Sequence, residues 1–131
     1  MTARREYRVD TQADPISHFT HAVQAGSLLF VSGIVPVDRE RMLVGGDDVI
    51  AQARVVFANM EEVLAAAGCS FGDVVKVTVF LTDVGDRPLV NRVREEVFGD
   101  TRPASTLVEV SALVIPGARI EVEAIALVPQ A

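Results

Sequence analysis

The chain has 131 residues, a length typical of one domain that buries roughly two-thirds of its unfolded surface. The acidic side chains outnumber Lys and Arg by 18 to 12, and the resulting net charge of −6 disfavours nucleic-acid binding. Half of the residues are hydrophobic, but no apolar run approaches the ~18 residues of a membrane span. We therefore expect no membrane partner and assign the surplus apolar surface to a subunit interface.

The cellular compartment is predicted from the cysteine count and the first residues. Cys69 is the single cysteine, so it forms no internal disulfide, which suits a reducing environment. The basic start, MTARREYRVD, is not followed by the apolar segment of a signal peptide. We expect a cytoplasmic protein whose single domain spans residues 1–131.

The first quarter of the chain is predicted to contain two strands. Residues 6–10 read as a short strand, residues 11–26 as an irregular segment, and residues 27–38 as a longer strand. Ser32 and Gly33 interrupt the longer strand, and a glycine inside a strand marks a bulge or a close backbone approach.

A long helix is the clearest local prediction. Asp47 or Asp48 is expected to cap it, and Gly68 is placed to end it near Ala67. Apolar residues recur along it at helical spacing: Val49, Ala53, Phe57, Met60, Leu64 and Ala67.

A strand and a second helix follow. Residues 73–82 alternate between an apolar face and a mixed face. The apolar face is expected to pack on helices and comprises Val75, Val77, Val79 and Leu81. Asp86 is expected to cap the second helix, whose first turn tolerates Pro88, and Gly99 is expected to end it.

The segment from Thr101 to Val128 predicts two more strands around a turn at Pro116 and Gly117. In the last strand, one face is wholly apolar. The other face begins with charged side chains and ends with apolar ones: Arg119, Glu121, Glu123, Ile125 and Leu127. A face of this mixed kind indicates partial cover by a neighbouring subunit with a pocket at its edge.

The predicted order is β-β-α-β-α-β-β. Strands that alternate with only two helices favour an α+β fold, with one mixed sheet and both helices on one face. The opposite face is then exposed unless the protein oligomerises.

Several of these segments together resemble the Rid family, also called YjgF or L-PSP endoribonuclease. The segments that carry the resemblance are FVSGIVPVD, AQARVVFANMEEVLAAAG, GDVVKVTVFLTDV, the pair Val90-Asn91, RPASTLVEV and RIEVEAIA. The resemblance implies a chorismate-mutase-like fold and a homotrimer with small-molecule clefts between subunits. It also implies hydrolysis of reactive enamines and imines without a metal or other cofactor.

The resemblance assigns site residues one by one. The catalytic positions fall on Glu121, which positions water, and on Asn91. The ligand-binding positions include Ser32 and Gly33, together with Phe19 in place of a cleft tyrosine. No metal site is predicted, since the two histidines, at positions 18 and 21, lack a third ligand.

The largest departure from the family pattern lies in RPASTLVEV. Ser105 stands where the resemblance places the arginine that grips a substrate carboxylate, and Leu107 replaces a cleft cysteine. Arginine binds a carboxylate through two charge-assisted hydrogen bonds, so 2-imino acids are expected to fit poorly. Arg102 is expected to point to the opposite strand face. Arginines on other elements remain candidates for the role: Arg87, Arg92, Arg94 and Arg119.

The remaining cleft would combine apolar side chains with few polar groups. Thr106 and His21 join the residues already named, and this composition suits a neutral or cationic ligand. A half-desolvated Glu121 would have a raised pKa and act as a general base on water. Alternatively, Glu121 simply pairs with Arg119 or with a lysine across the sheet.

Three functions remain open at this point. The first is hydrolysis of C=N bonds, supported by Glu121 and Asn91. The second is a non-catalytic trimer that binds a small metabolite, favoured by the residues at positions 19 and 105. The third is ribonuclease activity, which the acidic charge and the 5% aromatic content disfavour.

Overall fold

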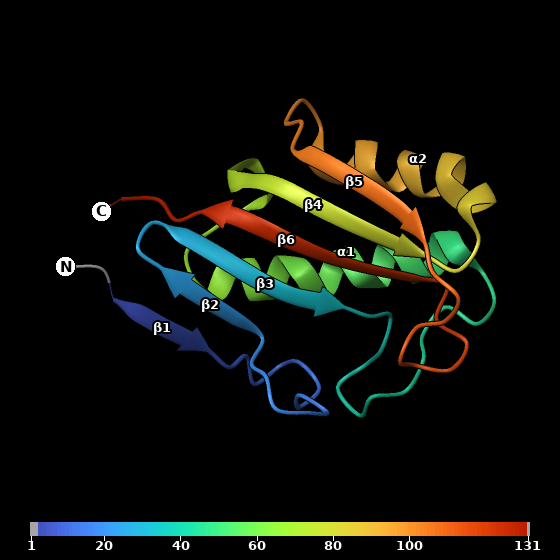
Figure 1. Cartoon of the computed structure of the whole chain (residues 1–131), viewed down its shortest axis with the longest axis horizontal. Helices are drawn as coiled ribbons and strands as arrows, with labels where there is room; N and C mark the ends of the chain where they lie inside the picture. The colour runs from blue at the N-terminus through green and yellow to red at the C-terminus, as the bar shows by residue number, and fades with distance from the viewer. Residues whose placement is uncertain (1–2, 131) are drawn as a thin grey trace.

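The computed structural model describes residues 3–130 and contains one mixed sheet with both α-helices on the same face (Figure 1). The strands are β1 (Arg4–Tyr7), β2 (Ala22–Ala25), β3 (Leu28–Ile34), β4 (Val74–Leu81), β5 (Ala104–Glu109) and β6 (Ile120–Leu127). The helices are α1 (Val49–Ala66) and α2 (Arg87–Phe98), and short 3-10 turns precede β4 and α2. The predicted α+β class is confirmed.

The sheet has the strand order β1-β2-β3-β6-β4-β5. β4 and β5 are parallel, and every other neighbouring pair is antiparallel. A parallel pair needs a crossover connection, and α2 supplies it between β4 and β5. β6 therefore lies in the middle of the sheet, although it is the last strand of the chain.

The segment predicted to be irregular contains a strand. Residues 22–25 form β2, which pairs with both β1 and β3. Gly26 turns the chain between β2 and β3 with a positive φ of 61°. The prediction was wrong because four residues are too few to display the alternation that identifies a strand.

Two other strand bounds differ from prediction. β1 covers residues 4–7 instead of 6–10, and β3 ends at Ile34. The expected irregularity at Ser32-Gly33 is present as a register shift between Val31 and Ile34.

The long helix has the predicted cap and stop. The Asp48 side chain accepts hydrogen bonds from the backbone N–H groups of Ile50 and Ala51, which satisfies donors in the first turn. Gly68 follows the C-cap Ala67 with φ of 77°, a conformation that glycine adopts without strain.

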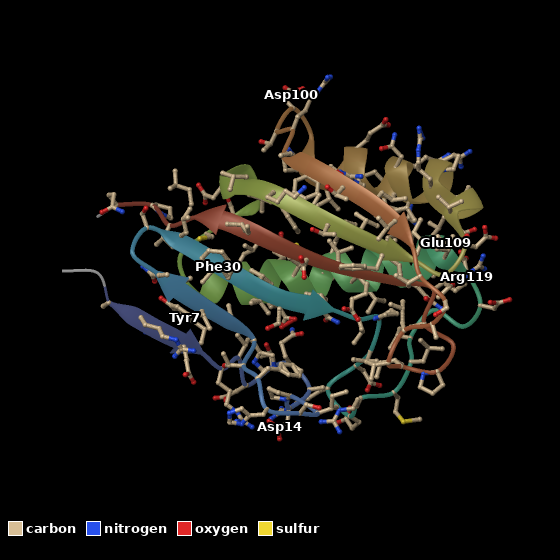
Figure 2. All side chains as sticks on the ribbon, in the orientation of Figure 1. Tyr7, Asp14, Phe30, Asp100, Glu109 and Arg119 are labelled. Carbon is tan, nitrogen blue, oxygen red and sulfur yellow. The ribbon has the colours of Figure 1, made fainter. Side chains whose placement is uncertain are left out.

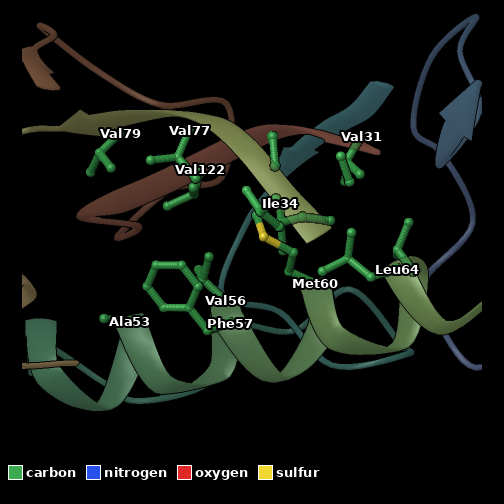
Figure 3. Close-up of a cluster of buried hydrophobic side chains, with 14 of the residues drawn as sticks. Val31, Ile34, Ala53, Val56, Phe57, Met60, Leu64, Val77, Val79 and Val122 are labelled. Carbon is green, nitrogen blue, oxygen red and sulfur yellow. The ribbon is translucent and has the colours of Figure 1, made fainter. Parts of the chain in front are cut away.

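The core fills the space between α1 and the sheet (Figure 3). The α1 side chains Phe57, Met60 and Leu64 are fully buried against the strands. Phe57 also packs edge-to-face on Phe98 at the end of α2. Burial of an apolar side chain of this size contributes about 1.5–3 kcal/mol, so the stripe on α1 fixes the helix to the sheet.

β4 departs from the predicted alternation at one residue. Val75 was expected in the core but is 45% exposed, whereas Val74 is buried. A register shift between Val74 and Lys76 causes the difference. A bulge adds one residue to a strand and so reverses the facing of its neighbour.

Asp86 occupies the N-cap position of α2, as predicted, but its side chain does not cap the helix. Its carboxylate instead receives two hydrogen bonds from the Arg119 guanidinium, at 2.7 and 3.0 Å. Arg119 precedes β6, so this partly buried pair ties the start of α2 to the middle of the sheet. No helix within residues 3–130 has the length and apolar character required to cross a membrane.

The sheet face away from the helices is called the open face here. Along β6 it carries Glu121, Glu123, Ile125 and Leu127, so the predicted change from charged to apolar is present. Phe30 of β3 lies on the same face beside Ile125 and is 43% exposed (Figure 2). The open face is thus an apolar surface next to a pair of carboxylates.

Candidate functional site

Glu121 lies on the open face near the start of β6, opposite Phe80 of β4. Within residues 3–130 its carboxylate has no hydrogen-bond or ion-pair partner. Arg119, which was considered as a partner, is engaged with Asp86 and with the backbone carbonyl of Asp47. The carboxylate is therefore free to act on a ligand.

A glycine at the irregular part of β3 makes room for this carboxylate. A Cβ atom built on Gly33 would collide with the Oε2 and Cδ atoms of Glu121. Any larger residue at this position would push the carboxylate away or distort the strand. The glycine inside the strand thus marks a close approach of the backbone to Glu121.

The surroundings of Glu121 change its acidity. Burial raises the pKa of the Glu121 carboxyl above its ordinary value, and repulsion from Glu123 on the same face adds to the rise. A carboxylate with a raised pKa holds a proton more strongly than an exposed glutamate. It is therefore a better general base at neutral pH.

A cavity of 440 Å³ opens beside Glu121. It lies between the loop that precedes β2, the end of β3 and the loop between β5 and β6. Among the residues predicted for the site, it is lined by Phe19, His21, Ser32, Gly33 and Glu121. Its volume is that of a site for a small molecule.

Two of these residues use their polar atoms to build the cavity wall. The Ser32 hydroxyl donates to the Thr20 carbonyl at 2.6 Å. His21 Nδ1 accepts from the Val9 N–H at 2.8 Å, so Nε2 carries the proton and donates to the Ala13 carbonyl at 2.9 Å. Both side chains hold the loop before β2, which leaves Glu121 as the free polar group of the predicted set.

The other predicted residues lie elsewhere. Asn91 is exposed on α2, where it donates to Glu95 at 3.2 Å. Ser105 and Leu107 lie opposite Val77 and Val79, whose side chains face the helices. Laterally paired residues share a face of the sheet. Ser105 and Leu107 therefore lie on the helix face, whereas Glu121 lies on the open face.

Thr106 lies neither at the cavity beside Glu121 nor on the helix face with Ser105 and Leu107. It lies opposite Thr78, on the open face, and its hydroxyl accepts a hydrogen bond from the Lys76 ammonium at 2.7 Å. Thr106 does not line the cavity beside Glu121. One chain thus does not bring the predicted site residues together.

Residues that were not predicted complete the cavity wall. Ile34 comes from β3 and Asn59 from α1, and the others come from loops and include Ile16, Arg41, Val114 and Ile115. Loops lack a hydrophobic period, so no alternation marks their contribution. The apolar run ALVIP between β5 and β6 was the one sequence feature that could have indicated the contribution of that loop.

The chain thus combines an α+β sheet, with both helices on one face, and a free, half-buried carboxylate beside a small cavity. The family model described as Endoribonuclease L-PSP matches residues 10–128 of the chain. The chain therefore belongs to this family, the same Rid family that the sequence segments resemble.

Curated relatives agree with this assignment. A RutC family protein of Pyrococcus horikoshii is 42% identical over 86% of this chain and 88% of its own length. The 3-aminoacrylate deaminase RutC of Acinetobacter baylyi is 38% identical over 86% and 88%. The mouse 2-iminobutanoate/2-iminopropanoate deaminase is 38% identical over 85% and 82%.

Solved structures share the fold. The crystal structure of the yeast protein YEO7 superimposes with a TM-score of 0.92 at 31% identity. The match covers 97% of this chain and 100% of the yeast chain. The chorismate-mutase-like topology implied by the resemblance is thereby confirmed.

Proposed function

We propose that the protein hydrolyses the C=N bond of small imines, or of the imines that form from small enamines by tautomerisation, with Glu121 as the general base. The observation that carries this proposal is the free, half-buried Glu121 carboxylate beside a cavity, with its pKa raised by burial. The names of the deaminase relatives support the reaction class.

The chemistry requires one base that also returns a proton. Glu121 removes a proton from water as the water oxygen bonds to the imine carbon, and the C=N double bond becomes single. The protonated Glu121 then donates to the nitrogen. This gives a carbinolamine, in which one carbon carries a hydroxyl and an amino group. Glu121 then takes the hydroxyl proton and passes it to the amino nitrogen, so that the C=O bond forms as the C–N bond breaks and ammonia leaves. No electrons are transferred to an external acceptor, so no redox cofactor takes part.

The complete site is proposed to form between two copies of the chain in a homotrimer. Glu121 and Ser105 lie on opposite faces of one sheet, so a small ligand in one chain does not reach both. A neighbouring copy that presents α2 and β5 to the cavity would bring Asn91, Ser105 and Leu107 beside Glu121. The apolar open face would supply the contact between copies.

The substrate preference is proposed to differ from that of the named deaminases. Phe19 is 48% exposed at the cavity and offers an aromatic surface without a hydroxyl. β5 supplies Ser105 instead of an arginine. The ring at position 19 favours substrates with apolar side chains, because a ring in contact with a ligand gains from burial of apolar area.

Ammonia release from freshly generated imines tests the reaction. An amino-acid oxidase acting on leucine supplies an imine with a carboxylate, and an amine oxidase supplies an uncharged imine. We expect the wild type to accelerate ammonia release and the Glu121→Gln variant to lose at least about 100-fold, since general-base catalysis contributes about 10²–10⁴-fold. Equal rates in the two proteins would contradict the proposal.

Binding without turnover is the second candidate function, and the same apolar cavity wall favours it. A protein of this kind would hold a small metabolite through Phe19 and the loop residues, with Glu121 as an acceptor. Absence of any acceleration of ammonia release from either imine, combined with saturable ligand binding, would establish this alternative.

A further inference from the structure

An arginine on α2 lies next to Ser105, the residue that replaces the expected arginine on β5. Arg94 extends from the helix, and its Nη2 atom donates a hydrogen bond to Ser105 Oγ at 2.8 Å. A guanidinium therefore lies against position 105 although residue 105 is a serine. Because residue 105 is a serine, Arg94 contacts a neutral hydroxyl there and not a second positive charge.

The Arg94 guanidinium is poorly satisfied within the chain. Of its five donor hydrogens, one is used by Ser105, and no carboxylate among residues 3–130 forms an ion pair with it. Burial lowers the pKa of Arg94, with no opposing contribution from an acid. A partly desolvated arginine without a counter-ion favours an incoming anion.

The position of Arg94 also fits the proposed cleft. Asn91 lies three residues earlier on α2, and residues three apart share one helix face. Asn91 and Arg94 therefore lie on neighbouring turns, with Ser105 beside Arg94. The group that the proposed neighbouring copy would present to Glu121 thus contains a cation.

We propose that Arg94 is the carboxylate-binding residue of this protein, held by Ser105, and that its substrates are imines or enamines that carry a carboxylate. This inference rests on the proposed function, because it places Arg94 in the same cleft as Glu121. The expectation that 2-imino acids fit poorly was based only on the absence of an arginine at position 105. A cation that comes from the helix replaces the one missing from the strand.

Ligand binding tests the inference independently of turnover. Calorimetric titrations would compare 4-methyl-2-oxopentanoate, the oxo acid released from the leucine imine, with its uncharged methyl ester. We expect the wild type to bind the acid more tightly than the ester. The Arg94→Ala variant should lose about 10- to 100-fold in affinity for the acid, the range expected for hydrogen bonds between charged groups, and little for the ester.

Two further arginines provide the comparison. Arg92 is exposed on the same helix, so Arg92→Ala should bind the acid as the wild type does. Arg41 lines the cavity beside Glu121 and is the competing candidate. Loss of acid affinity in Arg41→Ala but not in Arg94→Ala would overturn the inference.

Two more variants guard against a general structural effect. Arg94→Lys keeps the charge but lacks the planar fork, and it should bind the acid with intermediate affinity. Adding Ser105→Arg to Arg94→Ala should restore acid binding, because the cation returns to the strand. Failure of both variants to bind more acid than Arg94→Ala would contradict the assignment.

Kinetics separates this inference from the proposed function. In Arg94→Ala, KM for the leucine imine should rise about 10- to 100-fold, with kcat little changed, while Glu121→Gln lowers kcat. Turnover that depends on Glu121 but not on Arg94 would overturn the inference and leave the proposed function intact. Acid binding that depends on Arg94 in a protein without turnover would overturn the proposed function and leave the carboxylate-binding role of Arg94 intact.

Discussion

At the scale of single residues, the environment of Glu121 favours activity but lowers the stability of the fold. Its carboxylate is free of partners and half-buried, which favours proton transfer but costs folding free energy when it is charged. The absence of a side chain at Gly33 leaves room for it in this position. Stability and activity should therefore respond to Glu121 in opposite directions.

The pH dependence of stability follows from the raised pKa of Glu121. The folded protein holds this proton more tightly than the unfolded chain, whose value is near 4.5. This tighter proton binding stabilises the folded state. The contribution is complete below pH 4.5 and is lost as the pH rises through the higher pKa of Glu121 in the folded protein. The neutral Glu121→Gln variant should thus be more stable than the wild type at pH 7.5, by up to about 1 kcal/mol or roughly 3–5 °C in Tm.

Thermal unfolding at a series of pH values measures this effect. The difference between Glu121→Gln and the wild type should shrink toward pH 4. Glu61→Gln, an exposed change on α1, is the control and should shift Tm little at either pH. A Glu121→Gln variant that is less stable than the wild type at pH 7.5 would show that the carboxylate has a stabilising partner.

At the scale of elements, one buried side chain connects α1 to two loops. Gln52 is fully buried, and its Nε2 donates to the carbonyls of Gly46 and Gly117 at 2.7 and 3.0 Å. Its Oε1 accepts from the Arg119 backbone N–H at 2.7 Å. Gln52 thereby fixes the end of the loop whose residues Val114 and Ile115 line the cavity.

Replacement of Gln52 should affect both stability and the cavity. Gln52→Leu leaves two carbonyls and one N–H without these partners, at a cost of about 3 kcal/mol or roughly 10 °C in Tm. KM for imines should rise because the loop after β5 is less fixed. Thermal unfolding and steady-state kinetics measure the two effects. Glu61→Leu introduces the same side chain on the exposed face of α1 and should change neither; an equal loss in both variants would contradict the role of Gln52.

The sequence predicts the elements whose signals are local. α1 is long, amphipathic and marked by Asp48 and Gly68 at its ends, so its bounds were predicted almost to the residue. β2 has four residues, and its existence depends on pairing with β1 and β3. Val75 was misplaced because a bulge depends on the partner strand, which no single segment specifies.

The site was predicted less completely than the fold. Glu121 and Gly33 were identified from the resemblance, and the structure places them in contact. The separation of Glu121 from Ser105 depends on the parallel register of β4 and β5, and the loop contributions depend on packing. The contact between Arg94 and Ser105 joins a helix to a strand across the edge of the sheet, so spacing alone did not single out Arg94.

At the scale of the whole molecule, the open face is the surface through which we propose that copies associate. Phe30 lies beside Ile125, and Leu28 lies beside Leu127. Large exposed apolar side chains on one face indicate a contact surface. If homotrimers form through this face, activity requires assembly, because each cleft takes residues from two copies.

Sedimentation velocity tests this dependence. The wild type should sediment at three times the 14.1 kDa chain mass. Phe30→Asp should give folded monomers, because a charge on the open face would have to be buried without a partner. These monomers should lose imine hydrolysis although Glu121 and its cavity remain intact.

Met42 is 63% exposed but lies in the loop after β3, so Met42→Asp should remain trimeric and active. Full activity in Phe30→Asp monomers would show that one chain is sufficient, and the site would then have to be built from Glu121 and the loops around it, without α2 and β5.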